Sequence, residues 1–217
     1  MSFACDLSRQ RGVDALFDYA IQKMGGIDIF VANAGFAYWE PVEAPDWSRI
    51  EAILQTNVFS PLYSAQKMHT LFHGADYRVL ITSSLLGRIG LEGYALYAST
   101  KAAVDRFAEV YRLESSTQNR LVLVYPLAAR SRFFEEAGGG PVPWLSQSPE
   151  SAARAILRGI EKDREPIYTS WILRPMLLAH HLFPFTGRWY QALDAKVFRR
   201  HWATQEKQAS QGESGQD

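Results

Sequence analysis

Apolar residues recur along the chain in two patterns, and the first of them is helical. Residues 13–24 place apolar side chains at three- and four-residue steps, which predicts an amphipathic helix that ends at Gly25-Gly26. Before it we predict a short strand over residues 2–5 and an amino-terminal cap from Ser8. The same spacing, with capping residues where they occur, predicts helices over 46–73, 97–111 and 148–160.

The second pattern consists of short, continuous apolar runs. They occupy residues 27–31, 79–82, 120–125 and 166–169. Strands without polar alternation are buried on both faces, as in the middle of a parallel sheet. Because these runs alternate with the predicted helices, the sequence predicts an α/β fold.

Length and composition narrow the class of protein. The chain has 217 residues, which predicts one domain over residues 1–203, and the polar composition of residues 204–217 predicts a disordered tail. Lys plus Arg equals Asp plus Glu at 23 each, so no net charge favours a nucleic acid. Cys5 is the only cysteine, which argues against a disulfide framework and a zinc cluster. No signal-peptide pattern begins the sequence, and we therefore expect a cytoplasmic protein.

Candidate chemistry is concentrated in residues 84–101. Tyr97 and Lys101 are four residues apart, so on a helix they share one face. A nearby ammonium favours the phenolate and lowers the pKa of a phenol toward the range useful for proton transfer. Ser84 follows a predicted strand, at the end where α/β sheets bind ligands. A Tyr and a Lys at this spacing are also common on ordinary amphipathic helices.

Further residues in the sequence support a functional role for Tyr97 and Lys101. Ser84 and Gly87, followed by Tyr97 and Lys101, resemble the Ser-x-x-Gly and Tyr-x-x-x-Lys motifs of the classical short-chain dehydrogenase/reductase family. Asn33-Ala34-Gly35 and Asn57 match two further motifs of that family in the same order, and the resemblance runs from about residue 6 to about residue 131.

The resemblance implies a Rossmann-like, doubly wound parallel sheet and an NAD(P)-dependent enzyme that interconverts an alcohol and a ketone or aldehyde. By resemblance, Tyr97 exchanges a proton with the substrate oxygen, Lys101 lowers its pKa and holds the ribose, Ser84 binds the substrate oxygen, and Asn57 bends its helix and relays protons. The implied cofactor contacts are Asp6, Leu7, Asn33, Ala34, Gly35, Tyr97, Lys101 and Ser131. No metal site is implied. The expected partners are a small carbonyl or alcohol substrate and further copies of the chain, in a homodimer or homotetramer.

The chain also departs from the family pattern. The glycine-rich turn that receives the pyrophosphate is missing, so relative to the family the sheet is expected to be truncated at its amino end, without the first two strand-helix units. The strand near Cys5 must then pair with the strand at 27–31 or hang loose. Leu127 stands where the family has glycine and is expected to crowd the nicotinamide, while Ser131 replaces a threonine. NAD and NADP are not distinguished.

Other readings remain open. A binding or scaffold protein without turnover would explain the missing turn and Leu127, and a sugar-nucleotide epimerase shares Tyr-x-x-x-Lys.

Gly138-Gly139-Gly140 predicts a mobile lid. Residues 171–190 are expected to line an apolar pocket, to rest on a membrane surface or to cover a partner. The aromatic residues assigned to an apolar substrate pocket are Phe36, Tyr38, Trp39, Trp144 and Trp171.

Overall fold

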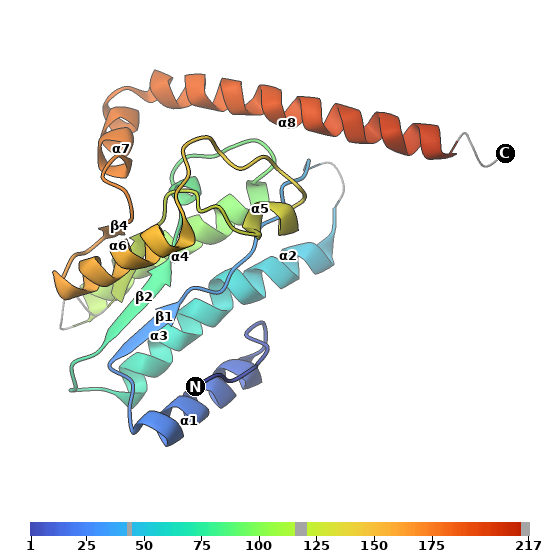
Figure 1. Ribbon diagram of the computed structural model, residues 1–217. Coiled ribbons are helices and arrows are strands. Elements are labelled where there is room, and N and C mark those ends of the chain that lie inside the picture. Colours follow the sequence, from blue (N-terminus) through green and yellow to red (C-terminus); the bar gives the residue numbers. More distant parts are fainter. Residues whose placement is uncertain (43–44, 116–120, 214–217) are drawn as a thin grey trace.

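The computed structural model describes residues 1–42, 45–115 and 121–213 (Figure 1). Its strands β1 (Ile29–Ala32), β2 (Arg78–Thr82), β3 (Leu121–Tyr125) and β4 (Ile167–Tyr168) form one parallel sheet in the order β1-β2-β3-β4. The helices are α1 (Gln10–Met24), α2 (Trp47–Leu54), α3 (Ser60–Leu71), α4 (Ala95–Glu114), α5 (Phe133–Glu136), α6 (Pro149–Glu161), α7 (Leu173–Leu182) and α8 (Pro184–Glu213). A π-helical turn, η1 (Gln55–Phe59), joins α2 to α3, and a 3-10 turn, η2 (Leu85–Gly87), precedes α4. The predicted parallel α/β fold is confirmed.

The sheet carries an apolar core on each face. On one face Phe17 of α1, Met68 of α3 and Val104 of α4 pack together with sheet residues of β2 and β3. On the other face Leu80 and the neighbouring strand residues pack against α6. Burial on both faces explains why the strands read as continuous apolar runs.

Helix ends follow the local sequence signals in three of four cases. Gly25 ends α1 in the left-handed conformation, at φ 80°. The Asp46 carboxylate accepts a hydrogen bond from the Arg49 N–H at 3.1 Å, and Ser148 caps α6 in the same way. The predicted cap from Ser8 is wrong, because its N–H and hydroxyl both donate to Asp6 and α1 begins after Arg9 without a side-chain cap.

The predicted strand over residues 2–5 is also wrong. Within the described chain, residues 2–5 pair with no strand, and Phe3 instead stacks on Tyr19 of α1 at 4.6 Å between ring centroids. Among the described residues, β1 therefore pairs on one side only, with β2. Ile29 and Val31 on β1 are 45% and 47% exposed, so this edge of the sheet presents apolar side chains to solvent.

The carboxyl-terminal helices lie along one end of the molecule (Figure 1). Helix α8 continues through residues 204–213, where composition predicted disorder. This segment is rich in Gln, Glu, Lys and Ala, which favour helix, and extending an existing helix avoids the cost of nucleation. Residues 214–217, and Arg120 at the start of a predicted strand, lie outside the described residues. No helix in the described part of the chain is long and apolar enough to cross a bilayer.

Candidate active site

Three of the predicted site residues lie close together, between the end of β2 and the first turns of α4. Ser84 follows β2 and caps η2, because its hydroxyl oxygen accepts from the Leu86 N–H at 3.2 Å. Tyr97 and Lys101 lie on the first two turns of α4, with the Lys101 Nζ 5.5 Å from the centre of the Tyr97 ring. The Ser84 hydroxyl lies near the Tyr97 phenol and acts to lower its pKa. The structure therefore brings hydroxyl, phenol and amine together.

Gly87 explains how the Ser84 turn comes so close to α4. A Cβ atom at residue 87 would lie 2.8 Å from the Lys101 carbonyl carbon and 3.0 Å from the Ala102 nitrogen. Both neighbours are backbone atoms of a helix and cannot move aside. Only glycine lets the turn rest directly on the helix that carries Tyr97 and Lys101.

Asn57 lies in the π-helical turn and is buried. Its Oδ1 accepts from the Phe36 N–H at 3.0 Å, and its Nδ2 donates to the Phe36 carbonyl at 2.8 Å and to the Thr100 hydroxyl at 3.2 Å. Thr100 in turn donates to the Tyr97 carbonyl at 2.7 Å. The Asn57 amide thus ties the segment after β1 to the turn of α4 that carries Tyr97, and this interaction accounts for an asparagine inside a helix.

Asn33-Ala34-Gly35 form an exposed backbone ledge beside these groups. A Cβ atom at Gly35 would lie 3.1 Å from the Asn57 Oδ1 and 3.6 Å from the Lys101 Nζ. Lys101 donates to the Thr82 carbonyl at 2.7 Å, and the Thr82 hydroxyl donates to the Asn33 Oδ1 at 2.9 Å. A ligand lying on this ledge would be within reach of the lysine.

Burial is the largest influence on the pKa values of both Tyr97 and Lys101. It raises the pKa of Tyr97 to about 12, and the Ser84 hydroxyl offsets only part of that increase. The pKa of Tyr97 is thus raised, whereas Lys101 was expected to lower it. Burial likewise lowers the pKa of Lys101 to about 8, against the attraction of Asp105. At neutral pH Tyr97 is therefore a neutral phenol, which is a proton donor.

Asp105, one turn after Lys101, was missed by the sequence analysis. Its carboxylate accepts from the Ser83 hydroxyl, from the Tyr125 phenol at 2.9 Å and from the Arg88 Nε at 3.1 Å. These bonds join the residue next to Ser84 to the helix of Lys101. The four-residue spacing from Lys101 to Asp105 was the available signal.

An aromatic wall surrounds Tyr97. Its ring packs against Tyr94 at 6.2 Å and Phe133 at 5.6 Å between centroids. Behind Tyr94 lies Trp39, which Phe198 of α8 contacts at 5.2 Å. No local sequence signal predicts the position of Phe198, because nothing near it in the chain indicates that α8 folds back onto this wall.

Two of the five aromatic residues that were assigned to an apolar substrate pocket do not lie at the aromatic wall. Trp144 and Trp171 are 89% and 83% exposed and do not join the wall, whereas Phe36 and Tyr38 pack edge to face at 5.3 Å near Trp39. A Cβ atom at Gly140 would lie 2.8 Å from the Trp39 ring, so the glycine segment rests against this side chain.

The remaining predicted contacts lie away from the turn of α4 that carries Tyr97. Asp6 is exposed in the turn before α1 and hydrogen-bonds Ser8, while Leu7 packs against the core. Ser131 is exposed and accepts from the Phe133 N–H at 3.4 Å. Among the described residues, no hydrogen bond or ring contact joins these three to Tyr97 or Lys101. Their cofactor role stays a prediction.

A surface hollow of about 260 Å³ lies next to the site but does not contain it. It is lined by Tyr38, Arg49 and Leu96 among others, and by none of Ser84, Tyr97, Lys101 and Asn57.

Comparisons with known proteins agree with the geometry. An uncharacterized oxidoreductase of Myxococcus xanthus is 28% identical over 169 residues, which cover 77% of this chain and 63% of that protein. The tetrahydroxynaphthalene reductase PfmaG of Pestalotiopsis fici is 28% identical over 116 residues, 52% of this chain and 41% of that reductase. The chain thus spans less than two thirds of the length of these curated relatives.

Solved structures share the fold. A short-chain dehydrogenase/reductase of Burkholderia phymatum in complex with NAD superposes with a TM-score of 0.71 at 16% identity, covering 83% of this chain and 74% of that one. A short-chain dehydrogenase of Sphingobium yanoikuyae in complex with NADPH gives 0.64 at 19% identity, over 87% and 73% of the two chains. The sequence profile described as short chain dehydrogenase matches residues 1–137, more than half of the chain. The protein therefore belongs to the short-chain dehydrogenase family.

Proposed function

We propose that this protein is an NAD(P)-dependent oxidoreductase that interconverts an alcohol and a ketone or aldehyde, with Tyr97 as the proton donor and acceptor. The observation that carries the proposal is the buried Tyr97 phenol, which lies near the Ser84 hydroxyl and has the buried Lys101 amine 5.5 Å from the centre of its ring. Proton transfer to a reacting carbonyl oxygen needs such a donor at hydrogen-bonding distance.

The roles of the side chains follow from their positions. In the direction of reduction the neutral Tyr97 phenol gives its proton to the substrate oxygen, and the Ser84 hydroxyl holds that oxygen in place. The Lys101 ammonium stabilises the phenolate that remains. Asn57 acts as a positioning residue, since its side chain holds Phe36 and Thr100 in place. A proton relay past Asn57 remains part of the proposal.

The nicotinamide cofactor would supply the hydride. The ledge at Asn33-Ala34-Gly35 suits the ribose, because it is exposed, lacks side-chain bulk at Gly35 and lies beside the Lys101 amine. At the pyrophosphate end the fit is poorer, since the described residues contain no glycine-rich strand-helix turn beside β1. Both NAD and NADPH occur in related solved structures, and both are candidates here.

An apolar, aromatic carbonyl is the proposed substrate class. Tyr94 and Trp39 of the aromatic wall are buried, whereas Phe133 is partly exposed and offers a ring beside Tyr97 against which a planar substrate can stack. Several relatives are named hydroxynaphthalene reductases, which is consistent with a fused aromatic ring.

We also propose that the protein forms a homodimer or homotetramer through η1, α3 and α4. Phe59, Leu71, Val110 and Leu113 on these elements are large apolar side chains exposed to solvent. Analytical ultracentrifugation tests this point, and a monomer at micromolar concentration contradicts it.

Reduction of a panel of aromatic ketones with NADH and with NADPH tests the catalytic proposal. We expect turnover in the wild type and a loss of roughly 10²- to 10⁴-fold in Tyr97→Phe, the range typical of a lost general acid. Tyr19→Phe on α1 is the matched control, because it removes the same oxygen outside the site. Equal activity of Tyr97→Phe and wild type would refute the assignment.

A second function, binding without turnover, is favoured by Leu127. The Leu127 N–H is bonded to the Thr169 hydroxyl at 2.9 Å, which fixes the backbone at the residue where the family has glycine. Fluorescence titration with NADH and NADPH separates the two functions. Saturable binding in the micromolar range supports the enzyme, whereas the absence of binding supports the scaffold.

A further inference from the structure

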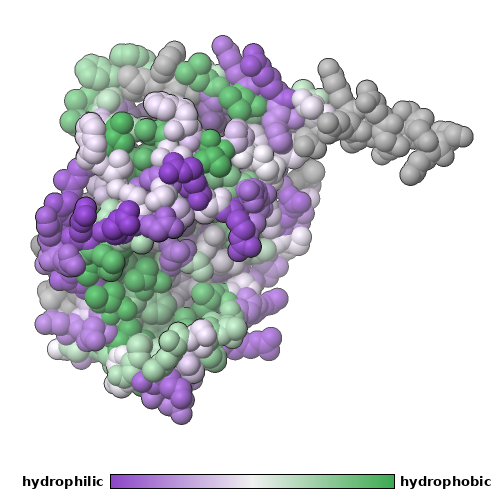
Figure 2. Space-filling view, in the orientation of Figure 1, coloured by the Kyte–Doolittle hydropathy of each residue, from purple (hydrophilic) through white to green (hydrophobic). Residues whose placement is uncertain are grey.

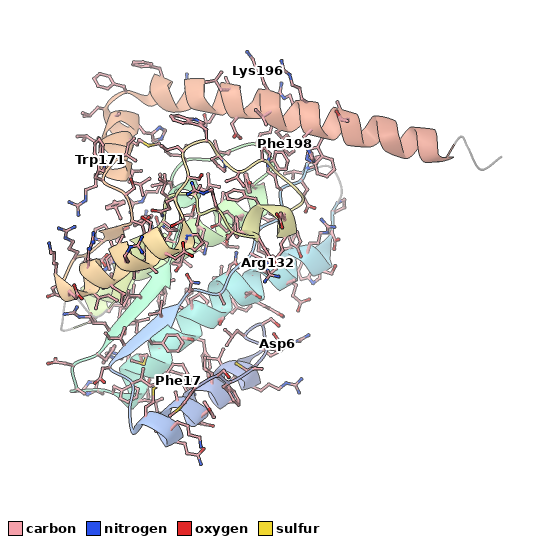
Figure 3. All side chains as sticks on the ribbon, viewed as in Figure 1. Asp6, Phe17, Arg132, Trp171, Lys196 and Phe198 are labelled. Carbon is pink, nitrogen blue, oxygen red and sulfur yellow. The ribbon has the colours of Figure 1, made fainter. Side chains whose placement is uncertain are left out.

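Helix α8 presents two different faces. Toward the body, the Gln191 side chain donates to the Gly90 carbonyl at 2.8 Å, Phe198 packs on Trp39, and Arg199 pairs with Glu92 at 3.0 Å. Figure 3 shows Phe198 on the side toward the body and Lys196 pointing away from it. The contacts that hold α8 thus use one face only.

The opposite face of α8 is exposed, and its residues follow one another at helical spacing. We call them the outer face of α8: Phe185, Leu193, Lys196, Val197 and Arg200. All five are either apolar or basic. This face combines aromatic and aliphatic side chains with cations.

The adjoining segment has the same character. Trp171 before α7, and Leu178 and Leu182 on it, are large exposed apolar side chains, and Arg174 is exposed among them. We call these four residues the outer face of α7. Figure 2 shows hydrophobic residues over α7 and the first turns of α8, with hydrophilic residues farther along α8.

Charge is segregated in the same region. Residues 171–202 contain five Lys or Arg residues and one acidic residue, Asp194. Because the whole chain has 23 of each, 18 basic and 22 acidic residues remain elsewhere. Asp194 is only partly exposed and lies near Glu92, and both its burial and that carboxylate raise its pKa. The residues of the two outer faces are cationic or apolar.

We propose that the outer faces of α7 and α8 bind the surface of an anionic phospholipid bilayer, with α8 lying along it. Aromatic and aliphatic side chains that insert at the headgroup boundary, flanked by Lys and Arg, are the composition of interfacial helices. Arg174, Lys196 and Arg200 give the outer faces positive charge without a facing acidic group among their described residues, so two copies that met there would bring like charges together, which disfavours a second copy as the occupant. Neither helix is long and apolar enough to cross the bilayer, so the contact is with its surface.

Vesicle flotation with the 217-residue chain tests this inference without any need for turnover. We expect flotation with vesicles of phosphatidylcholine and phosphatidylglycerol at low salt, and loss of flotation with phosphatidylcholine alone or at high salt. The double variant Lys196→Gln/Arg200→Gln is expected to weaken binding roughly twentyfold, since each basic residue near an anionic surface contributes to binding. Phe185→Ser/Leu193→Ser is expected to weaken it as well.

The matched control is Arg9→Gln/Arg11→Gln at α1, which removes the same charge from the opposite end of the molecule (Figure 1). It should float like the wild type. Equal weakening in this control, or no flotation of the wild type at low salt, overturns the proposal. A dimer that Phe185→Ser/Leu193→Ser dissociates, together with an absence of flotation, would make the face an interface between copies and overturn it too. All four target residues are exposed, and circular dichroism checks that the variants fold.

Discussion

At the scale of single residues, the Ser84 hydroxyl is the group that most directly adjusts Tyr97. In the proposed alcohol oxidation the Tyr97 phenolate is the base, and the phenolate fraction rises tenfold per pH unit below a pKa of about 12. The Ser84 hydroxyl acts to lower that pKa. Ser84→Ala is therefore expected to move the rising limb of the pH-rate profile for oxidation about one pH unit higher. The pH-rate profile measures this, and an unmoved limb speaks against the contact.

Lys101 is expected to reduce the stability of the fold at neutral pH. Its pKa is about 8 in the folded protein and near 10.5 in the unfolded chain, so the unfolded state binds the proton more tightly. Stability should then rise between about pH 8 and pH 10, and Lys101→Met should gain about 1–3 kcal/mol in free energy of unfolding at pH 7. Urea denaturation at pH 7 and pH 9.5 measures both effects. A less stable Lys101→Met would show that the hydrogen bond to Thr82 outweighs burial of the charge.

At the scale of elements, the contact between the Ser84 turn and α4 depends on Gly87. Gly87→Ala places a Cβ atom 2.8 Å from the Lys101 backbone, and the turn must move away from the helix. We expect a loss of about 1–3 kcal/mol in stability and a larger loss of activity, because Ser84 moves with the turn. Gly90→Ala is the matched control, since nothing lies within 4 Å of its added Cβ atom. Equal stability of the two variants in thermal unfolding would contradict this account.

The elements that could be predicted from the sequence are those with a local cause. Apolar runs predicted the strands, Gly25, Asp46 and Ser148 marked helix ends, and the spacing of Tyr97 and Lys101 placed them on one face. Local sequence does not explain why an asparagine occupies position 57 inside a helix. Its hydrogen-bond partner, the Phe36 backbone, is 21 residues away. The shift in the Tyr97 pKa had the wrong predicted sign, since burial by distant aromatic side chains leaves no local signal in the sequence.

At the scale of the whole molecule, the two ends of the chain escaped prediction for a related reason. A segment such as residues 2–5 becomes a strand only where a neighbour accepts its hydrogen bonds, and β1 does not pair with it. Conversely, the polar residues 204–213 are helical because they extend α8, whose position depends on Phe198 and Trp39. In both cases long-range contacts override local composition.

The unpaired edge of β1 gives the molecule a site of self-association. Ile29 and Val31 are about half exposed on a strand with open hydrogen-bonding groups, a combination that recruits further strands. Val31→Lys is expected to slow aggregation several-fold at equal stability, because charge on an edge strand opposes pairing. Light scattering during mild heating measures the rate. Leu157→Lys is the control, since it adds the same charge at an exposed residue of α6, away from β1 and from the proposed oligomer surface. If both substitutions slow aggregation equally, net charge is responsible and the edge of β1 is not.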